Sequence, residues 1–411
     1  MYSDSMDLAH FFLTILLLIF LGRTLGLIFV KLKFQSLIGE VLGGLILSPL
    51  ILGLIYPDDT LMLFSQFGIL ILMLLSGLLT DFRAFSENKN SSIVVGILGV
   101  IFSIILIFFT LTAFGIGFQS SLFISVVLSN TAVEVCATIL TKSRASKKIH
   151  AIIMGASFVD DIIAVFLIGV VGSMTLGYEI SLTSLILLSV KVILFIAITL
   201  ILLPYLLERY SLIDKFVGSG PQREKVLLTY TILFAILMGI MAIYAGLQVV
   251  IGAYIAGLII GKWGSRTSPM LKRRVAYEEL INDLSSYSHA LFTPLFFGYV
   301  GVSLGNVLRE YGFNISYVAL TIILSFVAII AKFIGCGSGA RISGMNLREA
   351  GYVGVAMGGR GALEMVLLTI GYEKGIISGP LFASIVIVTL FTVIITPVIF
   401  SLYERRFMAS P

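Results

Sequence analysis

Two adjacent carboxylates, Asp160 and Asp161, lie near the middle of the apolar segment GASFVDDIIAVFLIGVV. A charge at the centre of a membrane helix costs at least about 2.5–3.5 kcal/mol, so acidic residues kept there are candidates for ion or proton binding. Adjacent residues on a helix point about 100° apart, so each carboxylate needs a partner of its own. A proton-sharing aspartyl dyad would need one aspartate from each of two helices, which argues against an intramembrane protease.

Other charged residues interrupt apolar segments elsewhere in the chain. They are Glu134, Lys332, Arg360 and Glu364. Lys332 is the only basic residue of VAIIAKFIGCGSG and is a natural counter-charge for one of the two aspartates. A purely structural buried pair would add little stability, so a pair that opens and closes during transport is the better interpretation. Arg360 and Glu364 are four residues apart and could instead pair with each other.

Two of the apolar segments contain a break near their middle. In SVVLSNTAVEVCATIL the break is the polar triplet Ser129, Asn130 and Thr131, and in GYVGVAMGGRGALEMVLL it is the cluster GGRG. Glycine costs about 1 kcal/mol relative to alanine inside a helix. Interrupted segments in corresponding places of two halves point to the central site of a transporter with inverted repeats. The half-helix N-termini would favour an anion such as Glu134, and the opposing C-terminal ends a cation such as Lys332.

The elements that must position these residues are transmembrane helices. Hydrophobic residues make up 58% of the 411 residues and charged residues only 12%, against about 25% charged residues in a soluble protein. Thirteen apolar runs are long enough to span a bilayer as helices, which predicts an all-α polytopic membrane protein. These runs start near Leu8, Leu37, Leu61, Ser91, Ser121, Ile149, Ser181, Val226, Gln248, Leu284, Ile315, Ala350 and Ile377.

The basic residues of the loops predict the orientation. With the N-terminus outside, 21 Lys and Arg residues lie in cytoplasmic loops and two, Arg309 and Lys374, lie outside, in agreement with the positive-inside rule. We therefore expect the N-terminus outside and the C-terminus inside, with residues 1–411 forming one membrane domain and no soluble domain. The basic residues form no nucleic-acid footprint. Cys136 and Cys336 lie in apolar runs and predict neither a disulfide framework nor a metal cluster.

Six segments, taken in order, resemble a known group of transporters. They are GEVLGGLILSP, SNTAVE, ASFVDDIIAV, LFTPLFFGYVGV, AKFIG and GGRGALE. Together they resemble the monovalent cation:proton antiporters over nearly the whole chain. The likeness is to the second branch of that superfamily, whose bacterial and archaeal sodium/proton members carry two tandem aspartates.

The resemblance implies a homodimer of 13-span chains in the cell membrane. A dimerisation subdomain would comprise mainly spans 1–3 and 8–10, and a mobile core subdomain mainly spans 4–6 and 11–13, moving like an elevator. In that family the second aspartate, here Asp161, binds the cation or proton. The first, here Asp160, pairs with the lysine, here Lys332. Asn130 and Thr131 would line the site.

The expected chemistry is competition between a proton and a cation. Burial in an apolar medium favours the protonated form of a carboxylate. Sodium needs hard oxygen ligands, and we expect them from Asp161, Asp160 and Thr131, with Asn130 and Ser129 lining the site. If only an occupied site can reorient, the result is secondary active exchange of Na⁺ or Li⁺ for H⁺, which the family resemblance implies is electrogenic. We expect no enzymatic activity, no cofactor and, without a Walker A sequence, no nucleotide.

Three alternatives remain open. A K⁺/H⁺ antiporter differs only in the size of the site, and a potassium-efflux-type transporter would lack its nucleotide-binding regulatory domain, because the chain ends at Pro411. A sodium-coupled solute symporter of related fold would not need tandem aspartates paired with a lysine. A transporter-like sensor would carry a signalling domain.

Overall fold

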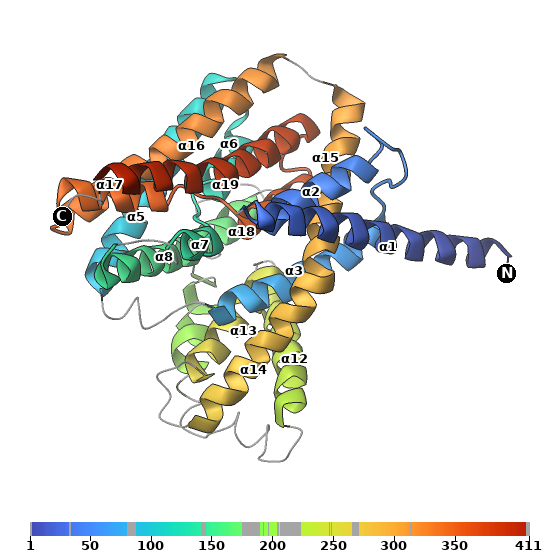
Figure 1. Cartoon of the computed structure of the whole chain (residues 1–411), viewed down its shortest axis with the longest axis horizontal. Coiled ribbons are helices and arrows are strands. Elements are labelled where there is room, and N and C mark those ends of the chain that lie inside the picture. The colour runs from blue at the N-terminus through green and yellow to red at the C-terminus, as the bar shows by residue number, and fades with distance from the viewer. Residues whose placement is uncertain are drawn as a thin grey trace. The chain divides into compact units, whose positions relative to one another are not determined.

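The computed structural model of the chain is helical, as predicted (Figure 1). It describes residues 2–32, 34–79, 88–140, 145–174, 190–191, 193–195, 197–203, 205, 223–245, 247, 249–264, 271–312 and 315–407. Every regular element within these ranges is a helix, and seven helices among them are long and apolar enough to cross a membrane. The all-α multi-pass class is therefore confirmed. The count of thirteen spans and the orientation stay predictions. The start of the span expected near Ser181 lies outside the described residues, which include only 190–191, 193–195 and 197–203 of this span.

Most long helices begin close to the predicted starts, because they coincide with the apolar runs. They are α1 (Tyr2–Lys31), α3 (Asp59–Leu79), α5 (Lys89–Ala113), α8 (Lys147–Met174), α12 (Arg223–Tyr244), α16 (Ile315–Ile342) and α19 (Gly379–Phe407). Helix α13 (Val249–Gly264) is shorter, and so is α2 (Ser36–Leu47). Helix α2 ends before Ser48 because the residue preceding a proline, here Pro49, disfavours the helical conformation.

One helical stretch is longer than predicted. Helix α14 (Leu271–Tyr287) runs through the π-helical turn η2 (Ser288–Phe292) into α15 (Thr293–Tyr311) without a loop. The predicted start near Leu284 therefore falls inside a continuous helix. The π-turn ends two residues before Pro294, whose ring removes a backbone donor and crowds the preceding turn. The Thr293 hydroxyl donates to the Ser288 carbonyl at 2.9 Å, which satisfies one acceptor of this turn.

The chain forms two compact units. The first comprises Met1–Arg23, Pro57–Thr80 and Leu176–Tyr299, and in it α3 packs against α13. A buried hydrogen bond from the Tyr277 hydroxyl to the Leu78 carbonyl ties α14 to the end of α3. The predicted division into a dimerisation and a mobile subdomain stays a prediction.

The second unit comprises Thr24–Tyr56, Asp81–Thr175 and Val300–Pro411 and holds every candidate site residue. Within it α16 contacts α5, α17 (Leu347–Ala356) and α19, and α5 contacts α8. Helices α5 and α16 run antiparallel and approach closely at Gly99 and Gly335, since a Cβ on Gly335 would lie 2.9 Å from the Cα of Gly99. This close contact places α16, which carries Lys332, beside α5, and α5 in turn packs against α8.

Candidate functional site

Two broken helices form the frame of the site. Helix α6 (Phe118–Val127) and α7 (Val133–Leu140) are separated by residues 128–132, and α17 and α18 (Ala362–Glu373) by residues 357–361. Both predicted breaks are therefore confirmed. The backbone N–H of Ala132 donates to the Gly359 carbonyl at 3.0 Å, which joins one break to the other. Gly359 is needed here because a Cβ would lie 2.5 Å from a methyl group of Val135.

A buried ion pair lies beside these breaks. Lys332 of α16 contacts the Oδ2 atom of Asp160 on α8, and both side chains are completely buried. Thr131, in the first break, donates to the same oxygen at 2.7 Å, and its hydroxyl also lies 3.2 Å from the Met357 carbonyl in the second break. The residues alone left open which aspartate meets Lys332. The structure pairs it with Asp160, as the family resemblance implied.

Several polar side-chain atoms of the site have no hydrogen-bond partner among the described residues. The Asp160 Oδ1 atom is one, and the amide oxygen and nitrogen of Asn130 are two more. Both side chains are fully buried, and Asp161 is only 3% exposed. Leaving buried polar groups unpaired costs about 1–3 kcal/mol each, so such groups call for a ligand or a functional role. An oxygen-rich cluster with one free carboxylate oxygen fits a small hard cation.

Arg360 and Glu364 do not form the i, i+4 pair that the sequence left open. Arg360 donates instead to the carbonyls of Asn130 and Ala328, the latter at 3.0 Å. Glu364 accepts from the N–H of Gly361 at 2.7 Å and caps the start of α18. The Arg360 guanidinium thus lies just beyond the C-terminal end of α6, and the Glu364 carboxylate lies at the N-terminal end of α18. The helix dipole favours each charge at its position.

The prediction that Lys332 and Glu134 complement the half-helix dipoles needs correction at one end. The cation that meets the carbonyl of the first break is Arg360, because Lys332 is held by Asp160. The side chain of Glu134 lies outside the described part of the structure. Ser129, expected to line the site, is buried and donates to the Val126 carbonyl at 2.8 Å at the end of α6.

Two further residues contact the helix breaks and were not predicted as site residues from the sequence. Ser157 donates to the Thr131 carbonyl at 3.2 Å and so holds the first break against α8. Its position three residues before Asp160, on the same helix face, could have indicated this role. Cys136 donates weakly to the Ala356 carbonyl at 3.4 Å, between α7 and the end of α17. Both contacts fix the breaks rather than offer ligands.

A family model described as "Sodium/hydrogen exchanger, transmembrane" matches residues 13–403. The chain belongs to the sodium/hydrogen exchanger family. Because this family consists of secondary transporters, the protein is a multi-pass cation/proton antiporter and not an enzyme. The resemblance read from the six segments is therefore confirmed.

The similarity to known relatives extends over nearly the whole length of this exchanger. It is 26% identical to a Na⁺/H⁺ antiporter of Enterococcus hirae, over 97% of this chain and 100% of the relative. It is 26% identical to the Na⁺/H⁺-K⁺ antiporter GerN of Bacillus cereus, over 94% and 95%. Its fold matches the sodium proton antiporter MjNhaP1 of Methanocaldococcus jannaschii with a TM-score of 0.73, 17% identity and coverage of 97% and 98%.

Proposed function

We propose that this protein exchanges Na⁺ or Li⁺ for protons across the cell membrane, with Asp161 and Asp160 as the carboxylates for which cation and proton compete. The observation that carries the proposal is the buried Thr131–Asp160–Lys332 arrangement beside two crossed helix breaks. The names of the relatives from Enterococcus hirae and Bacillus cereus support sodium as the cation.

The buried oxygens near Asp160 are the ligands that we propose for sodium. Asp160 Oδ1 and the Asn130 amide oxygen are buried without hydrogen-bond partners, and Thr131 adds a hydroxyl oxygen that retains lone pairs. Asp161 adds a second carboxylate at 3% exposure. Carboxylate, amide and hydroxyl oxygens are hard ligands, which suit an alkali cation, and no cofactor is required.

The ion pair couples the cation to the proton. While Lys332 neutralises Asp160, the pair carries no net charge, and a cation that engages Asp160 weakens the hold on Lys332. The released ammonium, in an apolar surrounding, can give up a proton. Together with the proton that sodium displaces from Asp161, two protons would then move against one sodium, which would make the exchange electrogenic. Alternating access by a homodimer of 13-span chains, with the N-terminus outside, completes the proposal.

A K⁺/H⁺ exchange is the second candidate, because GerN is named as a Na⁺/H⁺-K⁺ antiporter and matches 94% of this chain. The same oxygen ligands can hold either ion, and the size of the site decides between them. Transport of both ions by one site is therefore compatible with the geometry.

Proton flux in proteoliposomes tests these proposals. Purified protein should move protons when Na⁺ or Li⁺ is added, and the response to K⁺ separates the two candidates. Asp161→Asn should abolish the flux while the protein stays monodisperse in size-exclusion chromatography, because the amide keeps the volume and removes the charge. Substantial Na⁺/H⁺ exchange by Asp161→Asn would falsify the role of this carboxylate.

A further inference from the structure

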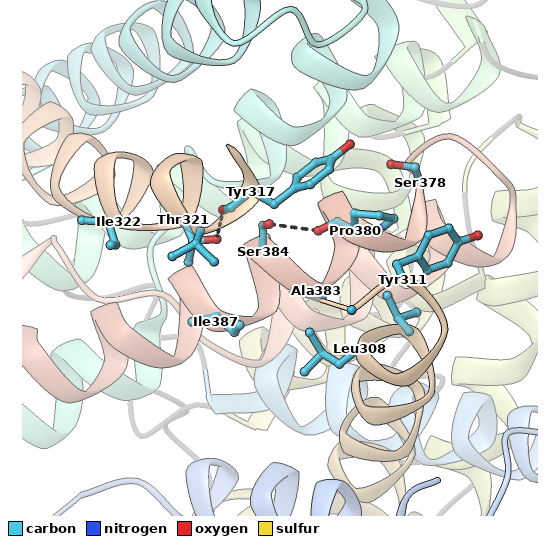
Figure 2. Close-up of a pocket in the computed structure, with 13 residues that line it drawn as sticks. Leu308, Tyr311, Tyr317, Thr321, Ile322, Ser378, Pro380, Ala383, Ser384 and Ile387 are labelled. Carbon is cyan, nitrogen blue, oxygen red and sulfur yellow. Dashed lines mark hydrogen bonds between the residues drawn. The ribbon is translucent and has the colours of Figure 1, made fainter. Parts of the chain in front are cut away.

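A cavity of about 710 Å³ lies within the second unit, and none of its lining residues belongs to the ion site. The end of α15, the first half of α16 and the first half of α19 form its walls (Figure 2). This volume falls within the range of about 300–1,000 Å³ that is typical of small-molecule sites. The proposed transport chemistry makes no use of it.

The walls of the cavity are apolar and open towards the apolar outer surface of the helices. Val318 and Ile322 of α16 line the cavity and are 42% and 54% exposed, and Ile387 of α19 lines it and is 37% exposed. Helices α16 and α19 are both candidate membrane spans. Exposed apolar side chains on such helices face hydrocarbon, so the cavity opens sideways into the bilayer rather than into water.

The polar groups of the cavity gather at one end. Figure 2 shows Tyr311, Tyr317 and Ser378 at the end where the helices begin or finish, and Ile322 and Ile387 at the other. Tyrosine is enriched where hydrocarbon meets headgroups. From Pro380 to Ile387 helix α19 rises about 10 Å, which is roughly a third of the 30 Å hydrocarbon thickness. The cavity therefore has the polarity and depth of part of one membrane leaflet.

Two further hydroxyls, those of Thr321 and Ser384, line the cavity without changing its apolar character. Thr321 donates to the Tyr317 carbonyl at 2.7 Å, and Ser384 donates to the Pro380 carbonyl at 2.9 Å. Each donor is thus already used within its own helix (Figure 2). A polar solute entering this cavity would find few donors, whereas an alkyl chain would regain the van der Waals contacts that the empty walls lack.

We propose that this cavity is a binding site for a membrane glycerophospholipid. One acyl chain lies between α16 and α19 against Val318, Ile322 and Ile387, and the headgroup lies beside Tyr311 and Tyr317. The proposal depends on the membrane-spanning fold of the second unit and is independent of the cation that the protein transports. A bound chain would join the ends of α15, α16 and α19 and stabilise their packing.

Filling the cavity tests the proposal. Ser384→Phe and Thr321→Phe each place a ring into it from a different wall, and Val398→Phe, on an exposed part of α19 outside the cavity, is the matched control. Native mass spectrometry with added palmitoyl-oleoyl phosphatidylglycerol should show a lipid adduct on the wild type and on Val398→Phe. The adduct, and the rise in melting temperature that accompanies it, should be lost in both filled variants.

Photolabelling of the wild type provides a test that does not depend on the folding of any variant. Phosphatidylglycerol carrying a diazirine in its acyl chain should label peptides of α16 and α19 that line the cavity. Labelling spread evenly over all exposed helices would overturn the proposal, because it would show only unspecific surrounding lipid. Equal adducts on the wild type and on folded Ser384→Phe and Thr321→Phe would also overturn it.

Discussion

At the scale of single residues, the two oxygens of Asp160 have different surroundings. Oδ2 is held by Lys332 and by the Thr131 hydroxyl, while Oδ1 has no hydrogen-bond partner among the described residues. The contacts to Oδ2 fix the orientation of the carboxylate, and Oδ1 is open to a ligand. The Lys332 ammonium and the Thr131 hydroxyl contact the same oxygen atom. Substituting each residue alone therefore tests their roles separately.

Replacing Lys332 by Gln should remove one transported charge per cycle. The amide keeps a hydrogen-bond donor near Asp160 but cannot carry the proton that the ammonium releases in the proposed mechanism, so exchange should become slower and electroneutral. Transport by Lys332→Gln under an imposed membrane potential measures this directly. Lys191→Gln, which changes an exposed lysine, is the control. A potential dependence equal to that of the wild type would mean that Lys332 serves only to hold the structure.

Replacing Thr131 by Ala should weaken sodium binding. The substitution removes a hydrogen bond to a charged oxygen, worth about 1.5–3 kcal/mol, and with it one oxygen ligand of the proposed site. The apparent KM for Na⁺ should rise by about tenfold or more. Thr131→Ser, which keeps the hydroxyl, should restore a KM near that of the wild type. Equal KM values for the Ala and Ser variants would exclude the hydroxyl from the site.

At the scale of the elements, the crossing of the broken helices leaves helix ends inside the membrane region, and charged side chains satisfy them. Arg360 donates to the Asn130 carbonyl in the first break, and Glu364 accepts from the Gly361 N–H at the start of α18. Unpaired backbone groups in hydrocarbon are costly, so these two side chains make the breaks tolerable. Arg360 also joins the first break to α16 through the Ala328 carbonyl.

Gly359→Ala should disrupt this crossing. A Cβ at this position would lie 2.5 Å from a methyl group of Val135, so α7 and the second break would have to separate. We expect a lower melting temperature and a loss of exchange, measured by thermal unfolding and proton flux. Gly117→Ala is the matched control, because a Cβ there meets nothing within 4 Å and the residue has an ordinary negative φ. Equal melting temperatures for the two variants would contradict the predicted clash.

At the scale of the whole molecule, exchange should depend on pH through competition at the aspartates. In the proposed mechanism protons bind the same carboxylates as sodium, so lowering the pH should convert them to the neutral form and remove the anionic ligands. The apparent KM for Na⁺ should therefore rise as the pH falls from mildly alkaline to mildly acidic. Fluorescence quenching in vesicles at graded Na⁺ concentrations gives this KM. A KM that does not change with pH would point to a separate proton pathway.

The membrane class, the candidate charges and both helix breaks can be predicted from the sequence alone. These features are local: Asp160 and Asp161 stand out because a charge within an apolar run is costly, and the breaks show in the triplet Ser129–Thr131 and in GGRG. The partners of these charged groups, in contrast, depend on how distant helices pack. Lys332 and Asp160 are 172 residues apart, and Arg360 lies 230 residues from the Asn130 carbonyl that it binds. Such groups come together only when the helices pack, because the position of a residue in the sequence does not determine which distant residue its side chain contacts.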